Sequence, residues 1–148
     1  MLLSYRIPRE PSTPRIAVWR RLKRLGVAQL GDGLVALPYD SATKEALEWV
    51  ATMIEEADGH ASMWIATPTI RRYGRDLADE LMKQRAAEYR ELIEQAHAAA
   101  DAGESARSRR ALRAELRRIE RRDYFAVPER AAAREAVNRL ESIARSEP

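Results

Sequence analysis

The sequence contains no cysteine, and this absence excludes several kinds of chemistry. Disulfide bonds, thiolate nucleophiles and cysteine-ligated metal centres are all ruled out. Long hydrophobic runs are missing too, since none approaches the ~20 apolar residues of a membrane-spanning helix. Arg6 and Pro8 interrupt the apolar start of the chain, so no signal peptide is visible. We therefore expect a cytoplasmic protein with no membrane partner.

Catalytic and metal-binding motifs are scarce. Only two histidines are present, His60 in an expected loop and His97 at an alanine-rich helix end, and their spacing matches no metal site. The fragment Gly31-Asp32-Gly33 precedes a strand, whereas a phosphate-binding loop precedes a helix. Asp32 is explained by the backbone tolerance that a turn requires. The sequence predicts a protein that is not an enzyme and holds no cofactor or metal.

The chain does contain enough apolar material for a core. Its 148 residues are 45% hydrophobic and 33% charged, which excludes a disordered chain. The net charge of +3 is only mildly basic. The distribution of charge along the chain is therefore more informative than the total.

A strand and a basic helix are predicted at the N-terminus. Leu3, Tyr5 and Ile7 alternate with more polar residues, which is the period of a strand. Ser12-Thr13-Pro14 is typical of a helix start with a hydroxyl cap, and Gly26 is typical of a helix end. The expected apolar stripe consists of Val18, Leu22 and Leu25, with Ile16 and Trp19 beside it. We expect Trp19 to belong to the core.

A hairpin, a second helix and a last strand follow. Apolar runs at 27–30 and 34–37 flank Gly31-Asp32-Gly33, and Asp-Gly between apolar runs is a strong hairpin signal. Asp40-Ser41 can cap an acidic helix. Residues 62–67 alternate again and predict a strand.

The resulting order is strand, helix, strand, strand, helix, strand, which predicts the α+β class. Two βαβ halves joined by a tight hairpin match a ferredoxin-like sandwich, with both helices on one face of an antiparallel sheet. We assign residues 1–68 to this domain. The predicted core consists of Leu3, Tyr5, Val18, Leu22, Leu25, Val35, Leu37, Leu47, Val50, Ile54, Met63 and Ile65.

Residues 69–148 predict an all-helical extension. Apolar residues recur at heptad-like spacing on both sides of a break at Asp101-Ala102-Gly103, which predicts an antiparallel helical hairpin. Pro128 fits the first turn of a C-terminal helix. The expected apolar seam consists of Met82, Ala86, Tyr89, Ile93, Ala96, Ala100, Leu112, Leu116 and Ile119, continued in the last helix by Ala136, Leu140 and Ile143.

Arginines are concentrated in the second half of this extension. Between Ser105 and Arg122 eight arginines face two acids, which gives this segment a net charge of +6. At 100° per residue, one row lies roughly opposite the apolar seam, where it suits phosphate contacts. This row consists of Arg110, Arg113, Arg117 and Arg121. The alternative is that the row pairs with the glutamates of the preceding helix, namely Glu80, Glu88, Glu91 and Glu94. The residue pattern favours neither phosphate contacts nor pairing with these glutamates.

The first helix carries a second basic cluster with the same two interpretations. Its members are Arg20, Arg21, Lys23 and Arg24. Together with the arginine row, these residues are the candidate DNA-binding residues.

Three stretches carry a resemblance to a known family. They are SYRIPREPSTPRIAVWRRLKRLG, the hairpin ending in Leu37-Pro38, and RRDYF followed by a proline that starts a helix. The chain resembles, over nearly its whole length, the N-terminal domain of the chromate-resistance regulator ChrB. The resemblance implies a DNA-binding regulator of a chromate efflux operon. Full-length members carry a further C-terminal chromate-resistance domain, so we expect a stand-alone relative or a fragment.

A more remote similarity joins the first 68 residues to the ferredoxin-like domains of the phenylacetate repressor PaaX and of small CRISPR adaptation endonucleases. Those nucleases place an acidic residue at the end of the first strand, where this sequence has Arg6 after Tyr5. The similarity therefore supports the fold and argues against nuclease activity.

Three functional hypotheses result. The leading one is a DNA-binding regulatory module that binds double-stranded operator DNA as a homodimer, formed through an apolar helix face or a sheet edge. The second is a protein-interaction or oligomerisation module that does not bind nucleic acid. The third is a sensor that binds chromate or another oxyanion as effector through its arginines.

Overall fold

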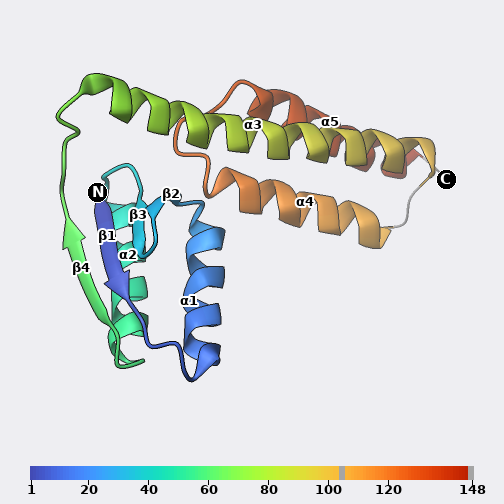
Figure 1. The fold of residues 1–148 in the computed structure, drawn as a ribbon. Coiled ribbons are helices and arrows are strands. Elements are labelled where there is room, and N and C mark those ends of the chain that lie inside the picture. Colours follow the sequence, from blue (N-terminus) through green and yellow to red (C-terminus); the bar gives the residue numbers. More distant parts are fainter. Residues whose placement is uncertain (104–105, 147–148) are drawn as a thin grey trace. The chain divides into compact units, whose positions relative to one another are not determined.

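The computed structural model describes residues 1–103 and 106–146, with side chains described as far as residue 140. The chain divides into two compact units, Met1–Leu81 and Met82–Pro148 (Figure 1). The elements of the first unit are β1 (Leu2–Arg6), α1 (Ser12–Leu25), β2 (Ala28–Gly31), β3 (Leu34–Ala36), α2 (Ser41–Glu55) and β4 (His60–Trp64). The remaining helices are α3 (Arg71–Asp101), α4 (Ala106–Glu120) and α5 (Glu129–Ser146).

The strands of the first unit form one antiparallel sheet in the order β2-β3-β1-β4. Leu3 lies opposite Val35 on β3 and Met63 on β4, so these three side chains share one face. The predicted α+β class is confirmed, with an antiparallel sheet in the first unit and five helices among the described residues.

The core of the first unit forms between the sheet and its helices. Helix α2 lies against β1 and β4, and α1 lies against α2. Asp40 caps α2 as predicted, because its carboxylate accepts from the Thr43 N–H at 2.7 Å and the Thr43 hydroxyl receives the Asp40 N–H at 3.0 Å. The buried apolar residues of these elements are Leu3, Val18, Leu22, Val35, Leu37, Leu47, Val50 and Ile54.

The predicted hairpin is present, and Gly33 explains its tightness. Gly33 has a φ of 69°, and its carbonyl accepts the Tyr5 N–H at 2.7 Å. A Cβ at this position would lie 2.2 Å from the Tyr5 carbonyl oxygen, so only glycine fits.

The core predictions for Ile65 and Trp19 are wrong, and Tyr5, Leu25 and Met63 of the predicted core are half-buried. Strand β4 spans His60–Trp64 rather than residues 62–67, so Ile65 lies beyond the strand and is 72% exposed. The strand ends there because its pairing with β1 runs from His60, opposite Arg6, to Trp64, opposite Leu2, where β1 begins. Trp19 is 53% exposed, since Val18 and Leu22 already occupy the buried side of α1.

Helix α3 begins in the first unit and continues into the second. Leu77 and Leu81 pack against Ala28 and Ala36 on the face of the sheet opposite to Leu3 and Val35. Residues 71–81 therefore contribute to the first core. The domain boundary predicted after residue 68 stays a prediction.

The second unit has a separate core between α3, α4 and α5. The predicted break is confirmed, because α3 ends at Asp101 and Gly103 follows with a φ of 61°. The core consists of Tyr89, Leu92, Ala96, Ala99, Leu112, Leu116, Ile119, Val127, Ala133, Ala136, Val137 and Leu140. The predicted seam residue Ile143 lies outside the described side chains.

Candidate nucleic-acid interface

Helix α4 exposes the predicted arginine row. Its opposite side buries Leu112, Leu116 and Ile119 in the core of the second unit, and this burial fixes the rotation of the helix. The four residues of the α4 arginine row, all exposed, are Arg110, Arg113, Arg117 and Arg121. Arg121 follows the last residue of α4, but its N–H donates to the Arg117 carbonyl at 3.2 Å and so continues the helical pattern.

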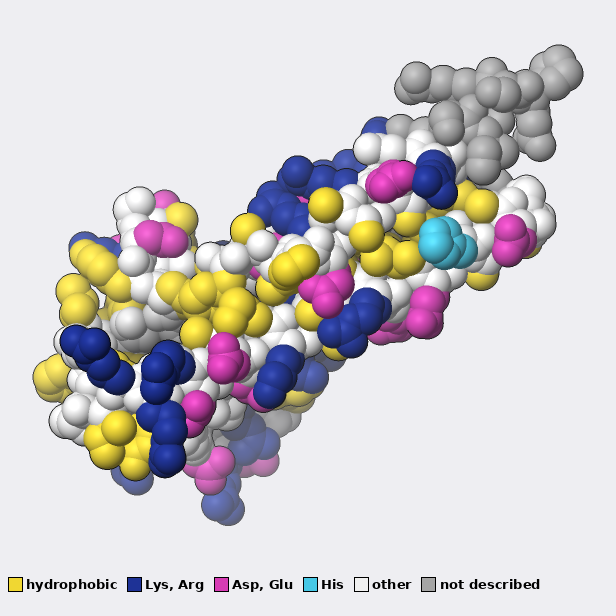
Figure 2. Space-filling model, turned by 90° about the horizontal axis from the view of Figure 1, so that it is seen from above, with side chains coloured by type: hydrophobic (Ala, Val, Ile, Leu, Met, Phe, Trp, Pro, Cys, Tyr) yellow, Lys and Arg dark blue, Asp and Glu magenta, His cyan; other side chains and the backbone are white. Residues whose placement is uncertain are grey.

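The two acids of α4 are engaged with other arginines. Glu115 forms an ion pair with Arg118 at 3.0 Å on the same helix. Glu120 pairs with Arg130, at 3.7 Å, and with Arg134, both on α5. Figure 2 shows Lys and Arg side chains gathered in one patch on a flank of the helical unit, beside more scattered acids. These pairings leave the excess positive charge of α4 on its exposed side.

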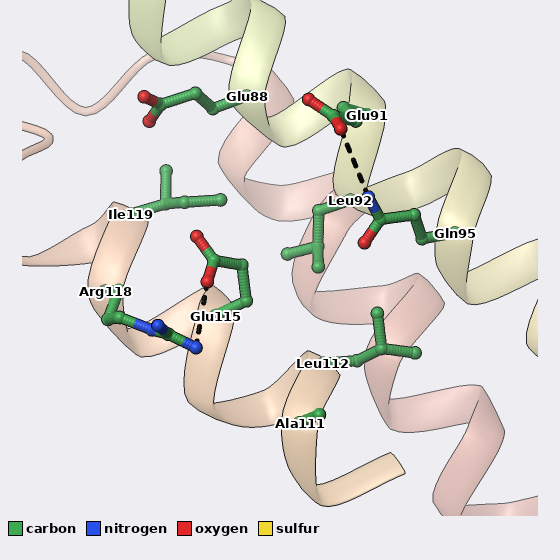
Figure 3. Close-up of a pocket in the computed structure, with 9 residues that line it drawn as sticks. All are labelled: Glu88, Glu91, Leu92, Gln95, Ala111, Leu112, Glu115, Arg118 and Ile119. Atoms are coloured by element: carbon green, nitrogen blue, oxygen red, sulfur yellow. Dashed lines mark hydrogen bonds and ion pairs between the residues drawn. The ribbon is translucent and has the colours of Figure 1, made fainter. Parts of the chain in front are cut away.

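A pocket between α3 and α4 carries a net negative charge, opposite in sign to the arginine row. Apolar side chains, including Leu92, Leu112 and Ile119, line it together with polar groups (Figure 3). Three of its lining residues are acids and one is an arginine, namely Glu88, Glu91, Glu115 and Arg118. Glu91 accepts a hydrogen bond from Gln95 at 3.2 Å. An anion would meet a net negative charge here, so this pocket is not an oxyanion site.

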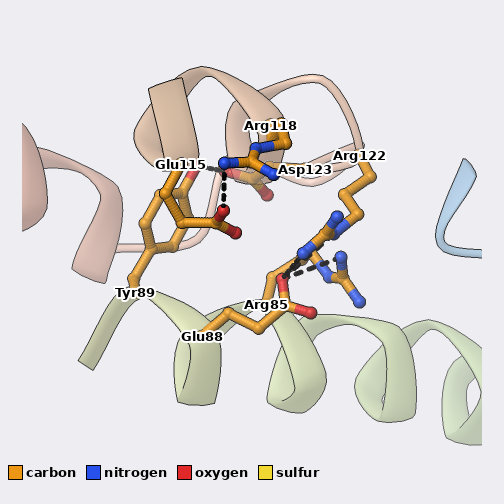
Figure 4. A network of polar contacts seen from close by, with 7 residues as sticks. All are labelled: Arg85, Glu88, Tyr89, Glu115, Arg118, Arg122 and Asp123. Carbon is orange, nitrogen blue, oxygen red and sulfur yellow. Dashed lines mark hydrogen bonds and ion pairs between the residues drawn. The ribbon is translucent and has the colours of Figure 1, made fainter. Parts of the chain in front are cut away.

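Glu88 on α3 contacts two arginines, and neither belongs to the row. Glu88 Oε2 lies 3.0 Å from Arg85 Nη1 and 2.9 Å from Arg122 Nη2 (Figure 4). Arg122 Nε also donates to Glu88 Oε2 at 3.1 Å, whereas Arg85 Nη1 lacks hydrogen-bonding geometry to this carboxylate. Of the four glutamates named by the alternative hypothesis, Glu88 thus pairs with Arg122, which is not a member of the row.

A buried polar contact anchors the chain just after α4. The Tyr89 hydroxyl donates to Asp123 Oδ2 at 3.1 Å, and the Val127 N–H donates to Asp123 Oδ1 at 3.3 Å. Tyr89 is fully buried, and burial first and the Asp123 carboxylate second raise the pKa of its hydroxyl. Burial likewise lowers the pKa of the Arg85 guanidinium. Together with the Glu88 pairs, this contact holds the end of α4 against α3.

This polar network was not predicted from the sequence. Its members on α3 and after α4 are separated by 34 residues, as in the pair Tyr89 and Asp123. The available signal was Asp123 itself, a carboxylate that follows two arginines directly after the apolar seam of α4.

The basic cluster of α1 is also on the surface. Arg20, Lys23 and Arg24 are exposed and Arg21 is half-buried. The Lys23 ammonium lies 4.3 Å from the centre of the Trp19 ring, a cation–π contact. Lys23 and Arg24 lie in the last turn of α1, where positive charge interacts favourably with the helix dipole. The positive charges of Lys23 and Arg24 are therefore explained in part by their contribution to the stability of α1.

Metal-binding groups do not gather in the part of the chain that the structure describes, where no three histidine, aspartate or glutamate side chains meet. His60 and the Ser62 hydroxyl are 3.2 Å apart, and His97 is exposed. Among the described helices, none combines the length and the apolar character needed to cross a membrane.

The fold and the exposed arginines define a small α+β protein with a basic helical unit. The family model "Protein ChrB, N-terminal" matches residues 15–102, which is more than half of the 148 residues. The chain therefore belongs to this family, as its motifs indicated, and the family connects it with the regulation of chromate resistance. The match includes the α1 cluster and ends before α4.

Comparison with curated proteins and with solved structures found no match. The remote similarity to PaaX-type repressors therefore stays a prediction.

Proposed function

We propose that this chain is the DNA-binding module of a transcriptional regulator in a chromate-resistance efflux system, and that it has no enzymatic activity. It would act in the cytoplasm as a homodimer on double-stranded operator DNA. The observation that carries the proposal is the exposed α4 arginine row, together with the engagement of Glu115 and Glu120 by other arginines. The assignment to chromate resistance rests on membership of the ChrB family.

A ferredoxin-like fold for the first unit belongs to the same proposal. Its strand order β2-β3-β1-β4 and its element order support this fold. The fold carries no functional argument, because function depends on the residues that a fold displays.

The spacing of the row suits a phosphate backbone. At ~1.5 Å per residue, Arg110 and Arg121 are separated by roughly 16 Å along the helix axis. This length is enough to span several phosphates, because each strand of a duplex carries one phosphate per ~3.4 Å of the duplex axis. Guanidinium groups bind phosphate oxygens bidentately. The row would thus contribute affinity that is independent of DNA sequence.

A salt titration tests the row. Each lost phosphate contact lowers the slope of log K against log salt concentration by roughly 0.9. We expect the double variant Arg110→Ala/Arg117→Ala to show a shallower slope than wild type on both an operator duplex and an unrelated duplex.

The matched control removes two arginines that are also exposed and that form ion pairs with glutamates. Arg90 pairs with Glu129 at 3.3 Å and Arg118 with Glu115 at 3.0 Å. The double variant Arg90→Ala/Arg118→Ala changes the net charge by the same amount and should keep the wild-type slope. If the two double variants behave alike, the row has no specific role.

The exposed tryptophans favour the second hypothesis, a protein-interaction module. Trp19, Trp49 and Trp64 are 53%, 62% and 59% exposed, and aromatic side chains are enriched at contacts between proteins. DNA binding that is absent at low salt, combined with capture of a protein by the chain, would select this function. Chromate as effector stays a hypothesis.

A further inference from the structure

We propose that the homodimer forms through strand β4. Two copies would join their β4 strands edge to edge and antiparallel, with Ser62 on the two-fold axis, so that one sheet continues through both copies. This inference specifies the surface of the dimer proposed above and does not depend on DNA binding.

The two edges of the sheet differ in how they are protected. The strand order places β2 and β4 at the edges. Strand β2 carries a register irregularity between Gln29 and Gly31, and such bulges discourage pairing with another chain. Strand β4 pairs regularly with β1 over all of its five residues, and its sequence HASMW contains no Lys, Asp, Glu or Pro. The usual protection is therefore present on β2 and missing on β4.

The direction of the backbone groups shows which residues of β4 can bind a further strand. The Met1 amino group donates to the Leu37 carbonyl at 2.9 Å, and the Tyr5 N–H donates to the Gly33 carbonyl at 2.7 Å. The odd-numbered residues of β1 thus direct their backbone groups towards β3, and the even-numbered ones towards β4.

On β4, the residues opposite these even-numbered positions are hydrogen-bonded to β1. They are His60, Ser62 and Trp64. Ala61 and Met63 therefore direct their N–H and C=O groups towards the free edge.

A two-fold axis at Ser62 makes this edge complementary to itself. Ala61 then lies opposite Met63 of the second copy, and each such pair exchanges both backbone hydrogen bonds. Ser62 faces Ser62, and His60 faces Trp64, in pairs whose side chains lie close together. No like charges meet, and the His60–Trp64 pairs bring an aromatic ring against an imidazole.

The apolar surface beside the edge supports the same contact. Trp64 is 59% exposed on the strand, and Ile65, immediately after it, is 72% exposed. Both side chains lie at the end of β4 that would meet His60 of the second copy. Pairing would cover apolar area that a monomer leaves in water.

Engineered cysteines test the register, because the natural chain has none. Ser62→Cys would place two thiols opposite each other with Cβ atoms about 5 Å apart, within reach of a disulfide after a small shift. The control is Gln29→Cys, also exposed on an edge strand. Under mild oxidation of the full chain, we expect a covalent dimer from Ser62→Cys and little from Gln29→Cys. Equal yields, or a higher yield from Gln29→Cys, would overturn the proposal.

A charge exchange tests the same axis by sedimentation without DNA. Ser62→Lys and Ser62→Glu should each be monomeric at concentrations where wild type is dimeric, because like charges would meet on the axis. A mixture of the two variants should restore the dimer. Circular dichroism of each variant checks that the fold persists.

Two outcomes would reject the β4 contact: a wild-type chain that stays monomeric at tens of micromolar, or single variants that remain dimeric. The variant Arg110→Ala/Arg117→Ala should sediment as wild type. Failure of the DNA-binding proposal and failure of the β4 contact are thus distinguishable.

Discussion

The two units of this chain differ in the kind of side chain that they expose. The first unit exposes large apolar side chains on every kind of element, and the most exposed are Trp49, Trp64 and Ile65. In the described part of the second unit, Phe125 is the only large apolar side chain that is counted as exposed. Arginines occupy the surface there, several of them paired with glutamates.

The two surfaces suit different classes of partner. Exposed aromatic residues are typical of contacts with proteins, whereas exposed arginines suit phosphates. We therefore propose that the first unit contacts proteins and that the second contacts nucleic acid. If the two units differ in this way, substitutions on their surfaces and in their cores should have different effects.

The largest effect is expected in the core of the second unit. Leu116 is 7% exposed, and Leu116→Asp would bury an unpaired carboxylate among apolar side chains. We expect a loss of about 3–5 kcal/mol in the free energy of unfolding. The control is Leu30→Asp on β2, where the side chain is 45% exposed and the change should cost under about 0.5 kcal/mol. Urea unfolding measures both, and similar losses would refute the assigned cores.

A smaller effect is expected at the polar network that anchors α4. Tyr89→Phe removes the hydroxyl that donates to Asp123 and leaves one oxygen of a buried carboxylate without this partner. The free energy of unfolding should fall by about 1–3 kcal/mol. If thermal and urea unfolding are unchanged, the contact does not contribute to stability.

The pH dependence of stability gives a second test of the contact between Tyr89 and Asp123. The pKa of the Tyr89 hydroxyl is raised above its ordinary value of 10.0, because burial and then Asp123 disfavour the phenolate. Above pH 10 the unfolded chain loses this proton while the folded chain keeps it, so stability falls as pH rises. Between roughly pH 9 and pH 11, the free energy of unfolding should fall more for wild type than for Tyr89→Phe. Parallel pH profiles would contradict the assignment.

The smallest effect on stability is expected at the exposed tryptophans. Trp49→Ser changes a side chain that is 62% exposed, so the free energy of unfolding should change by less than about 0.5 kcal/mol. A loss well above this value, measured by urea unfolding, would mean that Trp49 is covered by another part of the protein. In that case the contrast between the two surfaces would be weaker than described.

The parts of the fold with local chemical causes could be predicted from the sequence. Gly33 in the hairpin, Asp40 at the start of α2 and the break before Gly103 each depend on neighbouring residues alone. The exposure of the arginine row could also be predicted, because helical periodicity places it opposite Leu112, Leu116 and Ile119.

The remainder depends on contacts between distant residues, which periodicity does not contain. The burial of Ile65 was predicted from alternation, but the pairing of β4 with β1 ends the strand at Trp64. Trp19 was predicted to be buried from its type, yet Val18 and Leu22 already occupy the buried side of α1. The contact between Tyr89 and Asp123 could not be predicted without knowing how α3 packs beside the end of α4.

The most direct test of the assignment of nucleic-acid contacts to the second unit compares the two basic clusters in one salt titration. Arg110→Ala/Arg117→Ala removes charge from α4, and Arg20→Ala/Arg24→Ala removes the same charge from α1. We predict that the α4 variant lowers the slope of log K against log salt concentration by about 1.8, and that the α1 variant lowers it less. A larger decrease for the α1 variant would contradict this account and place the nucleic-acid contact in the first unit.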